Sequence, residues 1–116
     1  MKGKLEIRCD TIDERTCAYV LSGNLHGGND AYAFQDEVRD KITGSQRVIL
    51  DLAEVDRIDS SGIGILVALM WSASQSDGRM VLAALPERFK KILEIAMLLD
   101  HIDNTPTVEE ALQLIG

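Results

Sequence analysis

Two adjacent serines follow an aspartate in the segment Asp56–Gly64, and their hydroxyl groups offer the most informative chemistry in the chain. A serine in the first turn of a helix lies beside backbone N–H groups without helical partners, and their partial positive charge stabilises an attached phosphate. Ser60 and Ser61 are therefore candidate phosphorylation sites, with Asp59 as the acidic neighbour. Capping of the helix by Asp59 or Ser60 is the commoner use of these residue types, and the spacing alone favours it.

Patterns for catalysis and metal binding are missing from the sequence. Gly62-Ile63-Gly64 lacks the third glycine of a dinucleotide fingerprint, and no Gly-x-Ser-x-Gly elbow occurs. The two histidines, His26 and His101, lie far apart, and nothing in the sequence orients them for a triad. A metal site would have to recruit carboxylates from several elements. We therefore expect that the protein is not an enzyme and has no catalytic residue, metal or cofactor.

A strand followed by a helix must position the two serines. The run Val48–Leu52 is almost entirely apolar, which is typical of a central strand. The segment Ser60–Trp71 is apolar on nearly every side and predicts a helix that starts at its first residue or at the preceding aspartate and ends before Asp77. Gly62 and Gly64 are poor helix formers, so we expect close approach of this backbone to the sheet or to a partner.

The residues before this unit predict an antiparallel hairpin and a helix. Apolar and polar residues alternate over Leu5–Cys9, which is the period of a half-exposed strand at a sheet edge. Thr16–Ser22 is rich in strand-forming residues and closes at a glycine. After the loop Gly23–Gly28, we expect Asn29 or Asp30 to cap an amphipathic helix.

One more strand and two more helices follow the serines. Met80–Ala84 predicts a strand, and Pro86 begins a helix whose inward face should pack on the sheet. The expected inward residues of that helix are Phe89, Leu93 and Ala96. Asp100–Asp103 has room only for a very short strand, and the capping box Thr107–Glu110 starts a terminal helix.

Two further groups of side chains receive structural interpretations. Met70 and Trp71 lie on the strongly apolar helix and are expected to pack in the core. Arg88, Lys90 and Lys91 form a short basic cluster, which is typical of the solvated face of a helix. Neither group identifies a function.

These elements predict an α/β fold within one domain covering residues 1–116. We expect a mixed sheet of about four to five strands, an N-terminal antiparallel hairpin and about four α-helices. The hairpin supplies the antiparallel pair, and the alternation of strands and helices after it supplies the parallel crossovers.

Charge and cysteine content exclude several classes of protein. Twelve basic and nineteen acidic residues give a formal net charge of −7, which opposes binding to nucleic acid or to anionic lipid. Cys9 and Cys17 match neither a zinc site nor a redox pair, so we expect free thiols and a reducing compartment. The sequence has neither a signal core nor an apolar run long enough to span a bilayer, and we expect a cytoplasmic protein.

The order of these motifs resembles the STAS domain of bacterial anti-sigma factor antagonists. The likeness runs through Val48–Leu52 and Val55 to the stretch Ile58–Leu66, in which Asp-Ser-Ser-Gly-hydrophobic-Gly is the most specific part. It continues through Gly78–Leu82 and the Pro86 helix start, so it covers nearly the whole chain.

The resemblance implies a switch protein that works by binding. In the family, the unphosphorylated antagonist binds an anti-sigma factor, typically a serine kinase of the histidine-kinase-like ATPase type, and so releases a sigma factor. That kinase phosphorylates the serine directly after the aspartate, and a serine phosphatase restores it. By motif matching this serine is Ser60, and Asp59, Ser61 and Gly62 are its neighbours.

The resemblance also implies a partner-binding surface around this serine. Its expected residues are Asn24, His26, Ile63 and Gly64. Family members commonly carry Gly-x-Leu/Ile-Asp in the loop after the second strand, whereas this chain has His26 in place of the acidic residue. That departure leaves an alternative open, which is a STAS interaction module without phosphorylation that regulates a transporter or another signalling or secretion complex.

Overall fold

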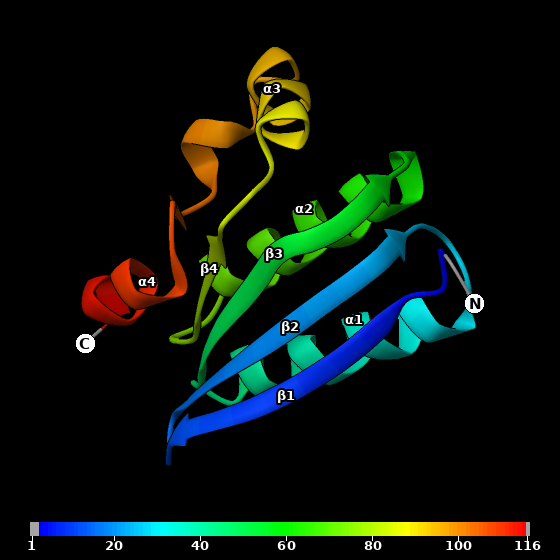
Figure 1. Ribbon diagram of the computed structural model, residues 1–116. Helices are drawn as coiled ribbons and strands as arrows, with labels where there is room; N and C mark the ends of the chain where they lie inside the picture. The colour runs from blue at the N-terminus through cyan, green and yellow to red at the C-terminus, as the bar shows by residue number, and fades with distance from the viewer. Residues whose placement is uncertain (1–2, 116) are drawn as a thin grey trace.

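The computed structural model describes residues 3–115, which form one five-stranded sheet and four α-helices (Figure 1). The strands are β1 (Glu6–Asp13), β2 (Thr16–Leu25), β3 (Arg47–Ile58), β4 (Arg79–Ala83) and β5 (Asn104–Thr105). The helices are α1 (Asn29–Thr43), α2 (Ser60–Ser74), α3 (Glu87–Ile95) and α4 (Val108–Ile115), with a 3₁₀ turn at Leu99–His101.

The sheet is mixed, and its strand order follows the sequence from β1 to β5. β1 and β2 pair antiparallel, whereas every later pair is parallel. The predicted α/β class, the N-terminal hairpin and the numbers of strands and helices are confirmed. The carboxyl ends of β2, β3 and β4 therefore lie at one end of the sheet, where open α/β sheets place functional groups.

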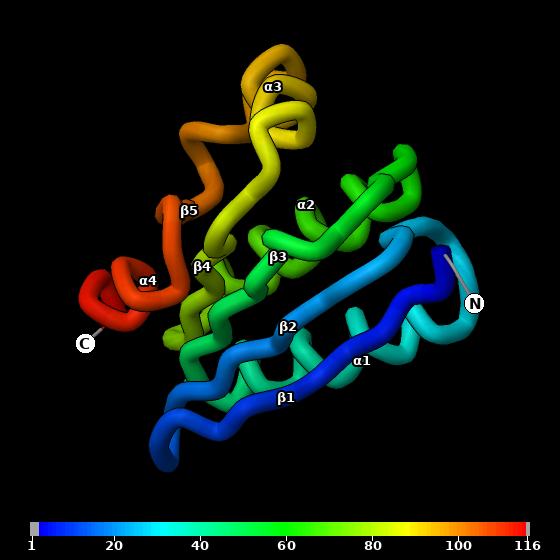
Figure 2. Tube along the Cα trace, viewed as in Figure 1, coloured from blue at the N-terminus to red at the C-terminus, as the bar shows by residue number. Residues whose placement is uncertain are grey.

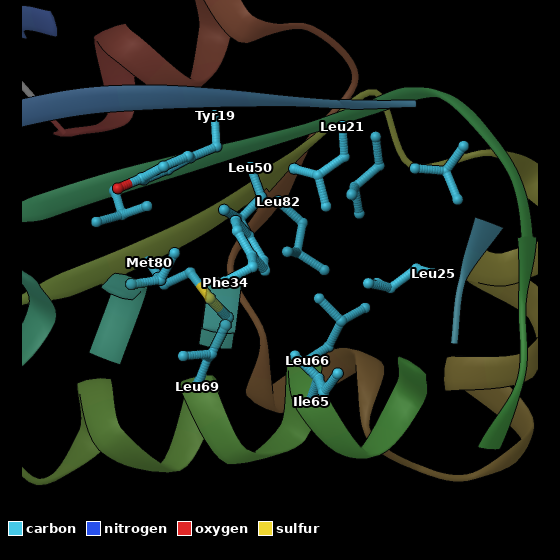
Figure 3. Packing of buried hydrophobic residues seen from close by; sticks show 14 of the residues in the cluster. Tyr19, Leu21, Leu25, Phe34, Leu50, Ile65, Leu66, Leu69, Met80 and Leu82 are labelled. Carbon is cyan, nitrogen blue, oxygen red and sulfur yellow. The ribbon is translucent and has the colours of Figure 1, made fainter. Parts of the chain in front are cut away.

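Side chains alternate between the two faces of the central strands, and this alternation builds the core. On one face, Tyr19, Leu50 and Leu82 pack with residues of α1 and α2 in the larger apolar cluster (Figure 3). On the other face, Ile49 and Val81 pack with α4 in a smaller cluster. Figures 1 and 2 show the resulting layers, with α1 and α2 behind the sheet as drawn and α4 on the opposite side.

β2 and β3 both extend beyond the segments predicted as strands. β2 continues through Gly23 and Asn24 to Leu25, and β3 continues to Ile58. They pair with each other along this extension, with two shifts of register. The expected loop thus begins only at His26, because pairing with β3 holds the residues before it in extended form.

α3 stands beyond the carboxyl end of β4, so its packing differs from the prediction (Figures 1 and 2). Phe89 and Leu93 are buried and join the larger cluster, as expected. Ala96 is exposed, because the helix ends at Ile95 and Ala96 caps its carboxyl terminus. The helix thus covers one end of the core and does not lie flat on the sheet.

Four other local predictions are wrong. Gly28 occupies the N-cap of α1 and no side chain caps that helix, because the helix already begins at Asn29. Asp100–Asp103 holds most of a 3₁₀ turn, and the short strand comes later, where Asn104 pairs with Leu82. β1 lies at the sheet edge, as predicted, but all eight of its residues are exposed and not only every second one. Trp71 is 63% exposed, since it faces away from the sheet.

Cys9 and Cys17 are both free thiols, as predicted, with Cys9 exposed and Cys17 buried. Among residues 3–115, no helix is long and apolar enough to cross a membrane.

A buried tyrosine links β2 to α1. The hydroxyl of Tyr19 donates a hydrogen bond of 2.6 Å to the Glu37 carboxylate, and its ring meets Phe34 edge to face at 5.5 Å. Burial, followed by the hydrogen bond and charge of Glu37, raises the pKa of Tyr19 far above its ordinary value. The folded protein therefore keeps Tyr19 protonated at a pH at which the unfolded chain ionises it.

We expect Tyr19→Phe to reduce the loss of folding stability that occurs as the pH rises into the alkaline range. Because the folded pKa of Tyr19 is raised, its contribution to stability is complete below the unfolded pKa of about 10 and is lost as the pH rises above it. Urea unfolding between about pH 8 and pH 11 should show a smaller loss of stability in the variant than in the wild type. Tyr32→Phe, at an exposed position, is the control. Parallel pH curves for wild type and Tyr19→Phe would contradict the prediction.

Candidate functional site

Asp59 caps the helix that carries the two serines. Its backbone is extended and its Oδ1 accepts a hydrogen bond of 2.9 Å from the Gly62 N–H. Of the two predicted caps, Asp59 thus fills the position, and Ser60 is the first residue of the helix. The Ser60 side chain is exposed, and within residues 3–115 its hydroxyl makes no hydrogen bond. The fold leaves this hydroxyl free for other chemistry.

The start of α2 lies directly against the end of β2. A Cβ at Gly62 would lie 2.2 Å from the Leu25 carbonyl oxygen and 2.9 Å from the Ile58 side chain, so only glycine fits there. The Asp59 N–H donates to the same Leu25 carbonyl at 3.4 Å. The close approach predicted for the first of the two glycines is therefore to the sheet.

The two serines differ in their surroundings. A Cβ on Gly27 would lie 3.1 Å from the Ser61 hydroxyl and 3.0 Å from the Tyr32 hydroxyl, which places Ser61 next to the loop after β2. Ser61 is half-buried there, whereas Ser60 is exposed. Of the two hydroxyls, the one on Ser60 is the more accessible to a modifying enzyme.

An open hollow of about 600 Å³ lies beside the helix start. Asn24 and His26 line it from β2 and the following loop, and Arg57 and Asp59 line it from the end of β3. The parallel register explains this meeting, because Asn24 pairs with Arg57. The structure thus brings Asn24, His26 and Asp59 together, although they are far apart in sequence.

The two remaining predicted residues differ in their packing. Ile63 is half-buried and packs against the larger apolar cluster. Gly64 is exposed, and a Cβ there would meet no atom within 4 Å. Packing within residues 3–115 therefore explains why position 62 requires glycine, but it does not explain the glycine at position 64. The expectation that a partner approaches Gly64 stays a prediction.

Arg88 is a residue of the site that the sequence interpretation missed. It is exposed, as expected for a solvated face, but its guanidinium also donates to the backbone carbonyls of Val55 at 3.2 Å and Asp56 at 2.6 Å. It also lies over the Phe89 ring, 4.4 Å from the centroid, and lines the hollow. Arg88 thereby ties α3 to the extension of β3. No local pattern signals this role, because its partners lie more than thirty residues earlier in the chain.

The site is open to solvent. Within residues 3–115 no three His, Cys, Asp or Glu side chains gather as metal ligands would. His101 lies in the 3₁₀ turn, away from His26 in the loop after β2, so the structure does not pair the histidines. The site thus consists of an exposed hydroxyl on a capped helix beside an open hollow.

Comparison with known proteins identifies the family. Residues 10–111 match the family model for the STAS domain, and the chain belongs to that family. A relative from Thermotoga neapolitana, named as a candidate anti-sigma factor antagonist, is 30% identical over 86 residues, which cover 72% of this chain and 76% of the relative. The resemblance seen in the sequence motifs is thereby confirmed.

Solved structures share the fold at lower identity. Phosphorylated SpoIIAA of Bacillus matches with a TM-score of 0.74 at 19% identity, covering 96% of this chain and 100% of that one. A sulfate transporter family protein from Wolinella succinogenes matches with a TM-score of 0.68 at 14% identity, covering 90% and 88% of the two chains. At these identities the matches establish the fold alone.

The two glycines of α2 provide a matched pair of substitutions. We expect Gly62→Ala to destabilise the protein by about 2 kcal/mol or more, because the added methyl group collides with backbone. Gly64→Ala should stabilise it by about 0.5–1 kcal/mol, because alanine favours the helix and space is open. Denaturant unfolding measures both changes in the free energy of unfolding. Equal effects of the two substitutions would contradict the close contact at Leu25.

Proposed function

We propose that this protein is an anti-sigma factor antagonist whose binding to an anti-sigma factor is controlled by phosphorylation of Ser60. The observation that carries the proposal is the exposed Ser60 hydroxyl, which the fold does not use because Asp59 caps the helix. A relative named as a candidate antagonist and the existence of a phosphorylated form of SpoIIAA support it. On this proposal the protein acts by binding and carries out no catalysis itself.

A phosphate on Ser60 would change the surface and leave the fold intact. It adds a charge of about −1.5 to −2 beside the first N–H groups of α2, whose partial positive charge stabilises it. The bond between Asp59 and the Gly62 N–H keeps the helix start in place. The new charge lies next to the Asp59 carboxylate, so a partner that tolerates Asp59 alone meets a local charge of about −2.5 to −3.

The proposed contact surface surrounds Ser60 on two sides. Asn24 and His26 line the hollow on one side, while Ile63 and Gly64 follow on the helix itself. Asp59, Ser61 and Gly62 hold the phosphoacceptor in position between them. Gly64 has no neighbour within 4 Å of its Cβ position, which suits close approach of a partner backbone.

The proposed partners act at the same serine. The anti-sigma factor is a serine kinase of the histidine-kinase-like ATPase type, and a serine phosphatase reverses its action. Both require the protein to work in the cytoplasm, where ATP and sigma factors are found. His26 offers a hydrogen-bonding imidazole where the family commonly has a carboxylate, so the complementary residue on this kinase should differ from that of other family members.

A second candidate function is a STAS interaction module that is not phosphorylated and regulates a transporter or another signalling or secretion complex. The fold shared with a sulfate transporter family protein and the departure at His26 favour it. Capture of partners from the native cell separates the two functions. A serine kinase supports the first, and a permease or transporter ATPase supports the second.

We expect Ser60 to be the residue that accepts phosphate. Incubation with the serine kinase captured from the native cell and with ATP should add one phosphate, detected by intact mass. Ser60→Ala should abolish the addition, whereas Ser61→Ala, which removes the half-buried hydroxyl, should retain it. A phosphate that persists in Ser60→Ala would overturn the site assignment, and no phosphate on the wild type would favour the second function.

We also expect substitutions around Ser60 to weaken binding of the unphosphorylated protein to that kinase. Ser60→Asp adds a negative charge, and Gly64→Ala adds a methyl group where the partner approaches, so each should raise the Kd at least about tenfold by calorimetry. Leu114→Ala changes an exposed residue of α4 on the opposite side of the sheet and should have no effect. The same Kd for Gly64→Ala and wild type would remove Gly64 from the interface.

A further inference from the structure

The edge strand β1 offers a second interaction surface, away from Ser60. All eight of its residues are exposed, and within residues 3–115 it pairs on one side only, with β2. Its register against β2 is regular from Glu6 to Thr11, and the irregularity comes only after Thr11. A regular edge of this length carries a row of unpaired N–H and C=O groups that can accept another strand.

Two opposite charges flank one residue of this edge strand. Arg8 and Asp10 flank Cys9 and lie on the same face of the strand, with Nη2 and Oδ2 3.3 Å apart. Both side chains are well exposed, at 71% and 48%. Cys9 lies on the other face and carries a free, exposed thiol. Charged side chains on an edge strand oppose pairing when a second strand brings like charges against them. This edge carries opposite charges side by side, so a second copy can meet it with complementary charges.

Whether these charges are complementary depends on the register in which β1 pairs with a second copy of itself about a twofold axis. In an antiparallel pair, two residues that lie directly opposite each other point to the same face of the sheet. When the two strands are identical and related by a twofold axis, this condition requires that one residue lies on the axis, opposite its own copy. With Cys9 at the axis, each Arg8 faces Asp10 of the second copy. With Arg8 at the axis, arginine meets arginine and Glu6 meets Asp10. With Asp10 at the axis, two aspartates meet.

We propose that β1 pairs antiparallel with β1 of a second copy of this chain, with Cys9 opposite Cys9, so that two five-stranded sheets join into one. The registers centred on Arg8 and Asp10 bring like charges together. A register centred on Ile7 also places Glu6 opposite Arg8, but only residues 6–8 of the two β1 strands then overlap. With Cys9 at the axis, residues 6–12 overlap, two ion pairs form, and no like charges meet among Glu6, Arg8 and Asp10. The backbone groups of the two edges supply the remaining hydrogen bonds.

The dimer is weak and leaves the candidate functional site free. A contact made by two edge strands is small, and a net charge of −7 on each copy opposes it, so the association is reversible. None of the residues around Ser60 lies on β1, and α2 begins at the carboxyl end of β3 (Figure 1). Each dimer therefore carries two copies of the site, and the pairing does not depend on the function proposed above.

Charge reversal tests the proposed register. We expect the wild type to shift from monomer to dimer in light scattering as its concentration rises toward about 1 mM. Arg8→Asp or Asp10→Arg alone places like charges opposite each other and should remove the dimer. The double variant Arg8→Asp/Asp10→Arg exchanges the two charges and should restore it. Unchanged far-UV circular dichroism confirms that each variant is folded.

Cross-linking tests the position of the axis. Diamide oxidises two Cys9 thiols to a disulfide, and its N=N bond takes up the two hydrogens and two electrons to become a hydrazine. Directly opposite Cβ atoms lie about 4.5–5.5 Å apart, so a small shift brings the two sulfurs together. Cys17→Ser should retain the cross-linked dimer, and Cys9→Ser should lose it. A wild type that stays monomeric, or a double variant that fails to regain the dimer, overturns the proposal.

Discussion

The approach of α2 to the end of β2 is the contact on which the candidate site depends. The absence of a side chain at Gly62 lets the helix backbone lie against the Leu25 carbonyl, which also accepts the Asp59 N–H. These contacts set the direction in which the first turn of α2 leaves the sheet, and hence where Ser60 projects. Any larger residue at position 62 has to displace either the helix or the strand.

The rest of the fold holds that contact in place. β2 and β3 pair to their last residues, Leu25 and Ile58, so the strand ends that meet α2 are themselves hydrogen-bonded. Arg88 bonds the carbonyls just before that end and thereby fixes α3 beside it. Strand ends and one anchored helix therefore form most of the wall of the hollow beside Ser60, and His26 from the loop after β2 completes it.

The sequence predicted the features whose causes are local. The apolar run at Val48–Leu52 and a cap at Asp59 or Ser60 each follow from a few neighbouring residues. For Gly62 the sequence indicated a close approach, but only the fold shows that Leu25 is the partner. The extension of β3 was missed because its exposed polar residues show no apolar pattern, and pairing with β2 holds them. Arg88 and the strand pair of Asn104 with Leu82 were missed because their partners are distant in sequence.

The residue that caps α2 and the proposed phosphoacceptor are two different residues, Asp59 and Ser60. If the Ser60 hydroxyl held the Gly62 N–H, a phosphate would have to replace a bond that the helix start requires. Because Asp59 makes that bond, the phosphorylation that we propose would leave the backbone unchanged and add a charge at one fixed point. Since the protein already carries −7, a further charge of about −2 changes its overall field little. On the proposed function, phosphorylation would therefore act where the partner touches Ser60, through local repulsion and the cost of burying the phosphate.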